Sequence, residues 1–381
     1  MTGPLAGRRI VELAGIGPAP FACMLLADMG ADVIRVDRPG GAHLPVSEPL
    51  PELFHRGKRS VVLDLKQPAG LEAALALVGT ADAVIEGYRP GVAERLGLGP
   101  TAVWNRNPRT VYGRMTGWGQ AGPLAASAGH DIDYIAVTGA LHAIGAAGGP
   151  PQIPLNLVGD FGGGSLYLVA GVLAAMLQAD RSGTGQVVDA AIVDGTAHLL
   201  TSLYSVLGAG LWTDQRGVNL LDGGVPFYSV YETSDGLYMA VGALEAKFFV
   251  SLVTLLGATD IDAAKQNDPT TWPAMRATFS RIFSSRTRDE WDAIFAGTDA
   301  CVAPVVSLRE AARHPHMSAR GSLVETADGL LQPGRAPRFS AHEADLPEPP
   351  RALGADTRSI LAELGLDVDG LFSTGAAVEA R

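Results

Sequence analysis

The feature that most constrains this fold is the regular alternation of short apolar runs and helix-like segments in the first third of the chain. A β-branched run at 9–13 leads into a Gly/Pro loop at 15–20, after which apolar residues recur at helical spacing. The same pattern predicts strands at 32–36, 83–85, 110–112 and 186–189, a helix at 68–79, and a glycine-rich turn leading into an apolar helix at 160–178. Such alternation is typical of a parallel sheet covered by helices. We therefore expect an α/β fold with a Rossmann-like sheet.

The pattern changes in the second half of the chain. Residues 226–242 contain two strand-like runs joined by Asp235-Gly236, which is a hairpin signature, and helix-like segments continue to about 300. A second, smaller α+β domain is therefore expected at 225–300. Near the end, Asp356 is expected at the N-cap of a helix, and the residues beyond Gly370 are expected to fray.

Composition excludes several classes of protein. With 381 residues the chain is long enough for two domains, and its net charge of −11 argues against non-specific nucleic-acid binding. Cys23 and Cys301 are too few and too far apart for a disulfide framework or a zinc site. The N-terminus lacks a secretory signal pattern, and the longest apolar run, at 166–177, is too short to span a membrane. We expect a soluble cytoplasmic protein that binds neither nucleic acid nor membrane.

The first loop invites a dinucleotide-binding interpretation. Gly15 and Gly17 follow a predicted strand, and Asp37 ends the next strand, about 20 residues further on. The position of the third glycine, however, is occupied by Pro20. A tight turn that delivers a helix N-terminus is therefore favoured, and a nicotinamide oxidoreductase is retained as an alternative of a different class.

Four cations stand close to predicted strand ends in this half of the chain: Arg38, Lys66, Arg89 and Arg95. Any one of them could be an ordinary surface charge. Ligands of open α/β sheets bind at the carboxyl ends of the strands, so the set as a whole fits an anionic, phosphate-bearing carrier.

Three residues could carry proton chemistry. His130 follows a glycine and can titrate near neutral pH, although an isolated histidine is more often structural. Asp160 opens a glycine-rich helix start, either as an N-cap or as an acid–base group beside N–H groups that could stabilise an oxyanion. Glu245 follows the predicted hairpin and, taken alone, is a solvated loop carboxylate. The other histidines show no ligand spacing, so no metal site is expected.

A set of short motifs occurs in a fixed order: Leu13-Ala-Gly-Ile-Gly-Pro18, Gly30-Ala-Asp-Val33 with Arg38-Pro39, Glu86-Gly-Tyr-Arg-Pro-Gly91, Arg95-Leu-Gly97, Met115-Thr-Gly-Trp-Gly-Gln120, Gly129-His-Asp131, Asn156-Leu-Val-Gly-Asp-Phe-Gly-Gly-Gly164 and Gln186-Val-Val-Asp-Ala190. As an ordered set they resemble the family III CoA-transferase superfamily and, within it, the α-methylacyl-CoA racemases. The resemblance runs from residue 5 to about 365 and implies an acyl-CoA substrate with no cofactor.

The resemblance implies a specific role for each of these residues. His130 would be one base, Asp160 the acid–base partner on the opposite face of the substrate, and Glu245 would orient His130 or help to ionise it. The CoA moiety would be held by Arg38, Leu63, Asp64, Leu65, Lys66, Gly87, Tyr88, Arg89 and Arg95. Gly129, Asp131, Ile132, Asp133 and Tyr134 would lie against the thioester and pantetheine end.

The resemblance also implies an architecture. Its parts would be a large Rossmann-like CoA-binding domain at 1–188, linker helices at 189–224, the small α+β domain at 225–300 and a return segment at 301–381 that packs on the large domain. The family forms an interlocked homodimer, in which the active site lies between the large domain of one chain and the small domain of the other. This would explain why Glu245 is so distant in sequence.

Two reactions compete within the family. A racemase removes the α-proton of an acyl-CoA thioester and returns a proton to the opposite face through an enolate. A CoA-transferase would instead use the Asp160 carboxylate as a nucleophile that forms a mixed anhydride. Gly129-His130-Asp131 and Glu245 favour the racemase, because a transferase has no evident need for a base there. A non-catalytic acyl-CoA-binding protein would leave His130, Asp160 and Glu245 without a purpose.

Overall fold

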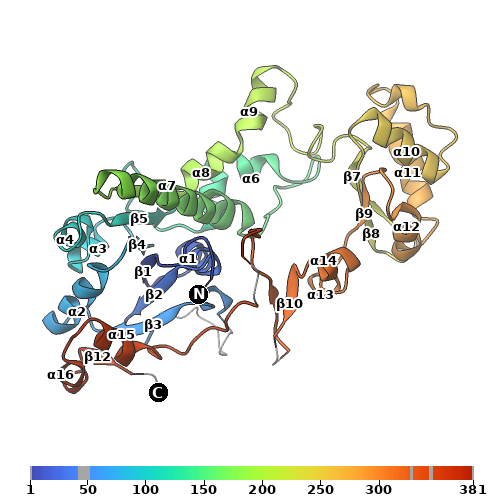
Figure 1. The fold of residues 1–381 in the computed structure, drawn as a ribbon. Coiled ribbons are helices and arrows are strands. Elements are labelled where there is room, and N and C mark those ends of the chain that lie inside the picture. Colours follow the sequence, from blue (N-terminus) through green and yellow to red (C-terminus); the bar gives the residue numbers. More distant parts are fainter. Residues whose placement is uncertain (1, 42–51, 327–328, 343–345, 380–381) are drawn as a thin grey trace. The chain divides into compact units, whose positions relative to one another are not determined.

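The computed structural model describes residues 2–41, 52–326, 329–342 and 346–379 (Figure 1). Contacts divide the chain into two compact units. The first comprises Met1–Thr138, Leu155–Leu200 and Ala319–Arg381, and the second comprises Gly139–Pro154 and Thr201–Ser318. The four-part division expected from the sequence is finer than this and stays a prediction.

The first unit is built on a seven-stranded sheet. Its strands are β1 (Arg9–Leu13), β2 (Asp32–Asp37), β3 (Arg59–Leu63), β4 (Ala83–Glu86), β5 (Val111–Thr116), β6 (Val187–Ala191) and β12 (Ala377–Val378). They lie in the order β12-β3-β2-β1-β4-β5-β6, and all neighbours are parallel except β12, which pairs antiparallel with β3. The predicted α/β fold with a parallel sheet is confirmed. The sequence analysis did not predict β3.

Helices cover both faces of this sheet. Those of the first unit are α1 (Pro18–Asp28), α2 (Pro68–Val78), α3 (Val92–Arg95), α4 (Pro100–Trp104), α5 (Asp131–Val137), α7 (Leu166–Ser182), α8 (Ile192–Leu199), α15 (Thr357–Glu363) and α16 (Val368–Ser373), with a short 3₁₀ turn, η1 (Leu53–His55). Leu26 of α1 and Val172 of α7 share one core, and Leu77 of α2 and Leu361 of α15 share the core on the opposite face. Burial on both faces explains why β1, β3 and β4 consist mainly of apolar residues.

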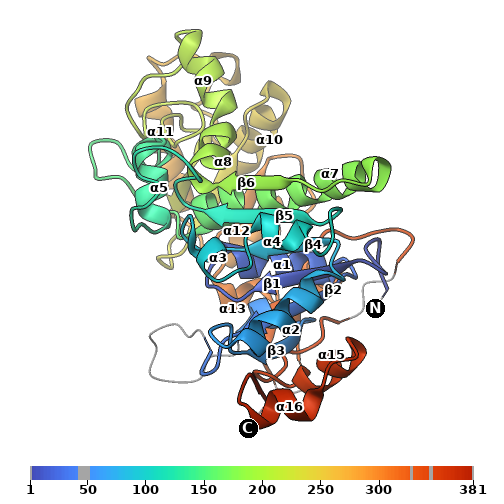
Figure 2. The same cartoon turned by 90° about the vertical axis from the view of Figure 1, so that its left-hand side faces the viewer.

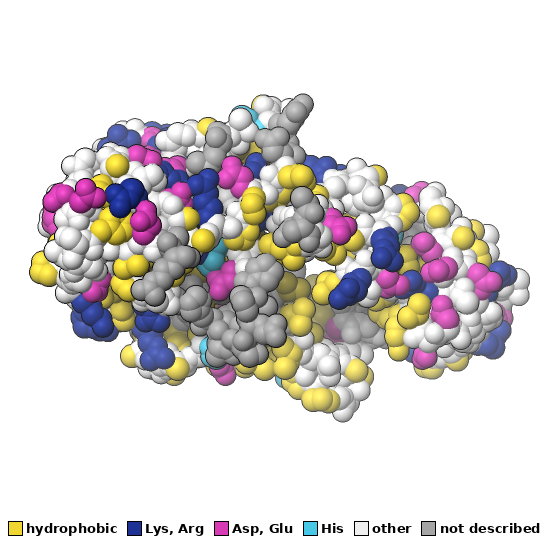
Figure 3. All heavy atoms as spheres, turned by 90° about the horizontal axis from the view of Figure 1, so that it is seen from below, with side chains coloured by type: hydrophobic (Ala, Val, Ile, Leu, Met, Phe, Trp, Pro, Cys, Tyr) yellow, Lys and Arg dark blue, Asp and Glu magenta, His cyan; other side chains and the backbone are white. Residues whose placement is uncertain are grey.

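Figure 2 shows the strands following one another from β6 to β3, with α15 and α16 beyond β3 beside the C-terminus. A small antiparallel pair, β10 (Leu323–Glu325) and β11 (Leu331–Pro333), also belongs to this unit. On the face drawn in Figure 3, Lys and Arg side chains are interspersed with Asp and Glu side chains among the coloured residues.

Among the residues that the structure describes, one helical segment, Leu157–Ser182, is long and apolar enough to cross a membrane by length and composition alone. It consists of a π-helical stretch, η2 (Leu157–Ser165), that continues into α7. Leu168, Val172 and Met176 of α7 are buried in the sheet core, which is the position of a core helix in a globular protein. The sequence expectation of a turn at the start of this segment is corrected, because the turn is itself helical.

The second unit has a three-stranded antiparallel sheet in the order β7-β8-β9. Its elements are α6 (Ala140–Ala143), α9 (Thr201–Gly208), β7 (Tyr228–Glu232), β8 (Tyr238–Gly242), α10 (Ala246–Leu256), η3 (Ala263–Lys265), α11 (Trp272–Phe283), α12 (Arg288–Phe295), β9 (Val302–Pro304), α13 (Leu308–Ala311) and α14 (Pro315–Ala319). β7 and β8 form the hairpin that the sequence predicts. Phe249, Phe279, Phe283 and Trp291 dominate the core of this unit.

Residues 371–379 do not fray, contrary to expectation. After α16 the chain adds β12 to the edge of the sheet, where Ala376 and Ala377 are buried. The backbone carbonyl of Ala376 accepts a hydrogen bond from the Asp64 N–H at 2.9 Å. Asp356 lies at the predicted N-cap of α15, but its carboxylate accepts from the Ser60 N–H at 3.0 Å instead of capping the helix. Both contacts tie the end of the chain to β3 and its following loop.

Candidate active site

A cavity of about 760 Å³ lies at the carboxyl edge of the sheet of the first unit. Its walls come from the loops after β1, β4 and β5, from η1, from the start of α5 and from η2. The sheet order places β1 beside β4, although β4 follows β3 in the chain, so two of these loops leave the sheet at its topological switch point. Open α/β sheets bind their ligands at this point.

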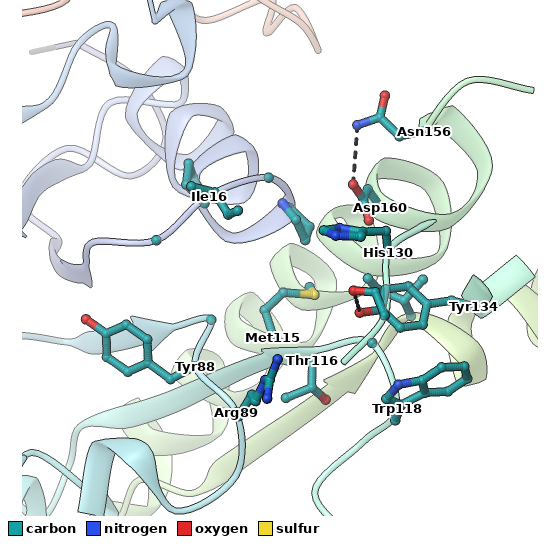
Figure 4. A pocket seen from close by; sticks show the side chains of 18 of the residues that line it. Ile16, Tyr88, Arg89, Met115, Thr116, Trp118, His130, Tyr134, Asn156 and Asp160 are labelled. Carbon is teal, nitrogen blue, oxygen red and sulfur yellow. Dashed lines mark hydrogen bonds between the residues drawn. The ribbon is translucent and has the colours of Figure 1, made fainter. Parts of the chain in front are cut away.

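Asp160 lies inside η2 and lines the cavity. It is therefore not an N-cap, which removes the structural alternative considered for it. The Asn156 amide donates to its Oδ2 at 3.3 Å, and Figure 4 shows this contact with His130 on the other side of the carboxylate. Burial raises the pKa of Asp160, and the negative charge of Asp131 raises it further, against the lowering effects of Asn156 and His130. A carboxyl group in this environment keeps its proton to higher pH than a solvated one.

The first turn of η2 is held by Asp131, which is 7% exposed. Its Oδ1 accepts the backbone N–H of Asp160 at 2.7 Å, and the Gly159 N–H also bonds to this carboxylate. A side chain at Gly159 would overlap the carboxylate, so glycine is required there. The sequence makes the N–H groups at this helix start candidates for stabilising an oxyanion. The N–H groups of Gly159 and Asp160 are not available for that role, because both bond to the Asp131 carboxylate.

His130 is the N-cap residue of α5, and its backbone N–H donates to Asp133 Oδ2 at 2.9 Å. The side chain is exposed and lines the same cavity as Asp160. Figure 4 shows the imidazole and the Asp160 carboxylate close together, one from the start of α5 and the other from η2. The structure therefore brings together two of the three residues predicted to carry proton chemistry.

Tyr134 is seated between two glycines at the side of the cavity. A β-carbon at Gly117 or Gly129 would overlap the Tyr134 ring, and Trp118 packs edge-on against this ring with centroids 4.8 Å apart. The Tyr134 hydroxyl donates to the Gly129 carbonyl. These contacts give a physical reason for the glycines in the Gly-Trp-Gly and Gly-His-Asp motifs, because they fix the loop that carries His130.

The residues predicted to bind CoA fall into two groups. Gly87, Tyr88, Arg89, Gly129 and Tyr134 line the cavity. Those that do not line it are Arg38, Leu63, Asp64, Leu65, Lys66, Arg95, Asp131, Ile132 and Asp133. Arg38 and Lys66 are exposed residues that follow β2 and β3, so they lie at the same edge of the sheet as the cavity. Asp131 is buried beneath η2, in a position to support the helix.

Glu245 belongs to the second unit, where it is the exposed N-cap residue of α10. It is not among the residues that line the cavity. Its proposed action on His130 therefore stays a prediction.

The part of the cavity wall that η1 contributes was not predicted from the sequence. Phe54 lines the cavity and packs against Phe21 and Phe161, with ring centroids 5.7 Å from each. His55 also lines the cavity, and its Nε2 lies 2.5 Å from Glu52 Oε2. Burial, with the charges of Arg35 and Lys58, lowers the pKa of His55. No motif marks this single turn, and Asn156 had no signal beyond its place in the glycine-rich motif.

Among the residues that the structure describes, no cluster of three or more His, Cys, Asp or Glu side chains could hold a metal ion. The two cysteines are free, with Cys23 buried and Cys301 exposed.

Comparison with known proteins agrees with this geometry. The model of CoA-transferase family III matches residues 5–357. The α-methylacyl-CoA racemases of Homo sapiens and Mus musculus are each 42% identical over 370 residues, covering 97% of this chain and 95% of theirs. A CAIB/BAIF family protein from Brucella suis has a similar solved structure, with a TM-score of 0.81 and 28% identity over 96% of this chain and all of its own. The chain therefore belongs to CoA-transferase family III.

Proposed function

We propose that this protein is an isomerase that inverts C2 of 2-methylacyl-CoA thioesters by cofactor-independent 1,1-proton transfer through an enolate. The observation that carries the proposal is the convergence of His130 and Asp160 in one cavity from two different elements. The racemase names and the coverage of the human and mouse relatives support this reaction.

The chemistry suits the two side chains. The α-proton of a thioester is only weakly acidic, so its removal needs a close base and stabilisation of the enolate oxygen. Inversion then requires a proton to arrive from the opposite face. An imidazole can accept a proton near neutral pH, and the raised pKa of Asp160 lets its carboxyl group act as the acid. His130 deprotonates one epimer, Asp160 deprotonates the other, and the two residues exchange roles in the reverse direction.

The same edge of the sheet suits the CoA moiety. Arg89 and Tyr88 leave β4 at the cavity, and Arg38 and Lys66 follow the carboxyl ends of two other parallel strands. Cations placed in this way complement the phosphates of CoA. The apolar side chains of the cavity, Phe54 among them, complement an acyl chain. A role in lipid metabolism follows from this substrate class.

We further propose a homodimer in which the partner subunit supplies Glu245 to His130. Helix α9 buries none of its residues and exposes Tyr204 at 56% and Leu207 at 40%. Leu211, just beyond it, is 78% exposed. Apolar side chains exposed together support a protein–protein interface.

This assembly can be tested with mixed dimers. We expect His130→Ala and Glu245→Ala each to be inactive as homodimers, whereas a mixed dimer would have one intact site, formed by the wild-type His130 of one chain and the wild-type Glu245 of the other. Unfolding and refolding the two variants together should restore about a quarter of wild-type activity. Failure to restore activity, when each variant refolds as a dimer, would contradict shared sites.

A cytoplasmic location is proposed as well, because two free cysteines suit a reducing compartment.

A CoA-transferase is the second candidate, and the name of the family favours it. There the Asp160 carboxylate, which faces the same cavity, would attack the thioester carbon, break its C–S bond to release CoA as the thiolate, and form a mixed anhydride. One experiment separates the reactions: a single epimer of a 2-methylacyl-CoA is incubated in heavy water, with and without a free carboxylic acid. Epimerisation with α-deuterium uptake and no acceptor acid supports the racemase. Transfer of CoA to the acid, without exchange at the α-carbon, refutes it in favour of the transferase.

A further inference from the structure

Three charged residues form a row across neighbouring strands at the carboxyl edge of the sheet. Glu86 on β4 is in register with Arg114 on β5, which is in register with Asp189 on β6. Glu86 is 3% exposed and Arg114 is 9% exposed. Glu94 of α3 also accepts a hydrogen bond from the Arg114 guanidinium. A single guanidinium therefore stands among three carboxylates.

Arg114 does not neutralise all three of these carboxylates. Its Nη2 donates to Glu94, and its Nη1 donates to Gln120 Oε1 at 2.7 Å. Its Nε lies 3.8 Å from Glu86 Oε1 and has no hydrogen-bond partner among the described residues. Glu86 is thus the most buried carboxylate of the group, and its contact with the cation is longer than that of Glu94. Burial, with the charges of Glu94 and Asp189, raises the pKa of Glu86 to about 7, against the effects of Tyr88 and Arg114. Among the described residues, Tyr88 and Tyr112 are further titratable neighbours, and burial raises the pKa of each phenol, which keeps both neutral near neutral pH.

Glu86 is connected directly to the cavity wall. Its Oε2 accepts the backbone N–H of Tyr88 at 2.6 Å. Gly87, Tyr88, Arg89 and Pro90 follow at once and line the cavity. The ionised carboxylate makes a charge-assisted hydrogen bond to this N–H, which is roughly twice as strong as a neutral one. Protonation of Glu86 weakens this bond and removes the attraction to Arg114.

We propose that Glu86 is a positioning residue of the acyl-CoA site, whose ionised carboxylate holds the Gly87–Pro90 wall in place and whose protonation loosens that wall and weakens CoA binding. The inference rests on the proposed function, because it takes this wall to contact CoA. It adds a pH-sensitive element that lies outside the proton-transfer pair.

The test is calorimetric titration of the purified full-length chain with free CoA, from about pH 6 to about pH 8. Glu86→Gln keeps an acceptor oxygen for the Tyr88 N–H but cannot ionise. We expect it to bind CoA about fivefold more weakly than wild type at the upper end of this range and equally at the lower end. The ionisation of CoA itself affects both proteins equally. The ratio of their affinities for CoA therefore reports the ionisation of Glu86. Near neutral pH, wild type should release more protons on binding than the variant.

A second variant leaves Glu86 itself unchanged, so the test does not depend on whether the Glu86→Gln protein folds normally. Glu94→Gln removes a negative charge and frees Arg114 for Glu86, so the midpoint of the pH dependence should move to lower pH while its amplitude stays. Glu72→Gln, in the exposed Glu72–Arg106 pair, is the matched control and should behave as wild type. Identical pH dependence and proton release in wild type and Glu86→Gln would overturn the inference. Absence of CoA binding by wild type at every pH would instead overturn the proposed function itself.

Discussion

The carboxylate of Asp131 accepts the backbone N–H of Asp160 at 2.7 Å, which ties the start of α5 to the π-helical turn of η2. The same carboxylate raises the pKa of Asp160 through its negative charge. Asp131 therefore positions Asp160 and also tunes it, a role that differs from the CoA contact expected from the sequence.

Replacing Asp131 should separate these two effects. Asp131→Asn keeps an acceptor oxygen but removes the charge, so the pKa of Asp160 should fall. The limb of the pH–rate profile that reports Asp160 should move to lower pH by up to about one unit. Asp131→Ala leaves two buried N–H groups without an acceptor and should lower the free energy of unfolding by about 1–3 kcal/mol for each. A limb that stays in place in Asp131→Asn would show that the charge is not felt at Asp160.

Asn156 should have the opposite effect. Its amide donates to Asp160 Oδ2 at 3.3 Å and stabilises the ionised form. Asn156→Ala should therefore raise the pKa of Asp160 and move the same limb to higher pH, by a few tenths to about one unit. The side chain is exposed, so stability should change little. A shift in the same direction as that of Asp131→Asn would contradict the assignment of this limb to Asp160.

A buried ion pair supports the first turn of α1, which forms part of one cavity wall. Lys58 Nζ lies 2.5 Å from Glu12 Oε2 and donates to the Pro20 carbonyl at 2.9 Å, and both side chains are almost fully buried. Lys58→Met leaves the Glu12 charge unpaired and should lower the free energy of unfolding by about 3–5 kcal/mol. The double variant Glu12→Leu/Lys58→Met should recover much of this loss in urea denaturation. Arg106→Met, in an exposed pair, should cost less than about 1 kcal/mol.

The fold could be predicted largely because its signals are local. Apolar runs such as 9–13 and 32–36, separated by helical periodicity, predict a parallel sheet, and Asp235-Gly236 predicts the β7–β8 hairpin. The C-terminal strand could not be predicted in this way. Residues Ala377–Val378 form a strand only because the edge of β3 is available to pair with them.

The residues of the site likewise divide into those that a sequence motif marks and those that only tertiary contacts bring to the cavity. His130 and Asp160 stand in distinctive glycine-rich motifs, and the structure places both in one cavity. Phe54 and His55 lie on a single turn with no motif, and only tertiary packing brings them to the cavity. The function of Asp131 was likewise hidden, because its partner, the Asp160 N–H, is a backbone group 29 residues away.

The C-terminal strand supplies a prediction of its own. Deleting residues 376–381 removes two buried alanines and the carbonyl that accepts the Asp64 N–H at 2.9 Å. Loss of this edge strand should lower the free energy of unfolding by about 2 kcal/mol and free the segment that leads to Lys66. CoA should therefore bind more weakly, as measured by calorimetry below the melting temperature. A truncated chain with full-length stability and affinity would show that this strand has no part in positioning the segment.

The most direct test of the central claim is α-proton exchange by single-base variants in heavy water. If His130 and Asp160 each serve one face of the substrate, Asp160→Asn and His130→Gln should each lose racemisation by at least about a thousandfold. Each variant should still exchange the α-proton of one epimer with retention of configuration, and the two variants should act on opposite epimers. Exchange of the same epimer by both variants, or racemisation that survives either substitution, would contradict the two-base account.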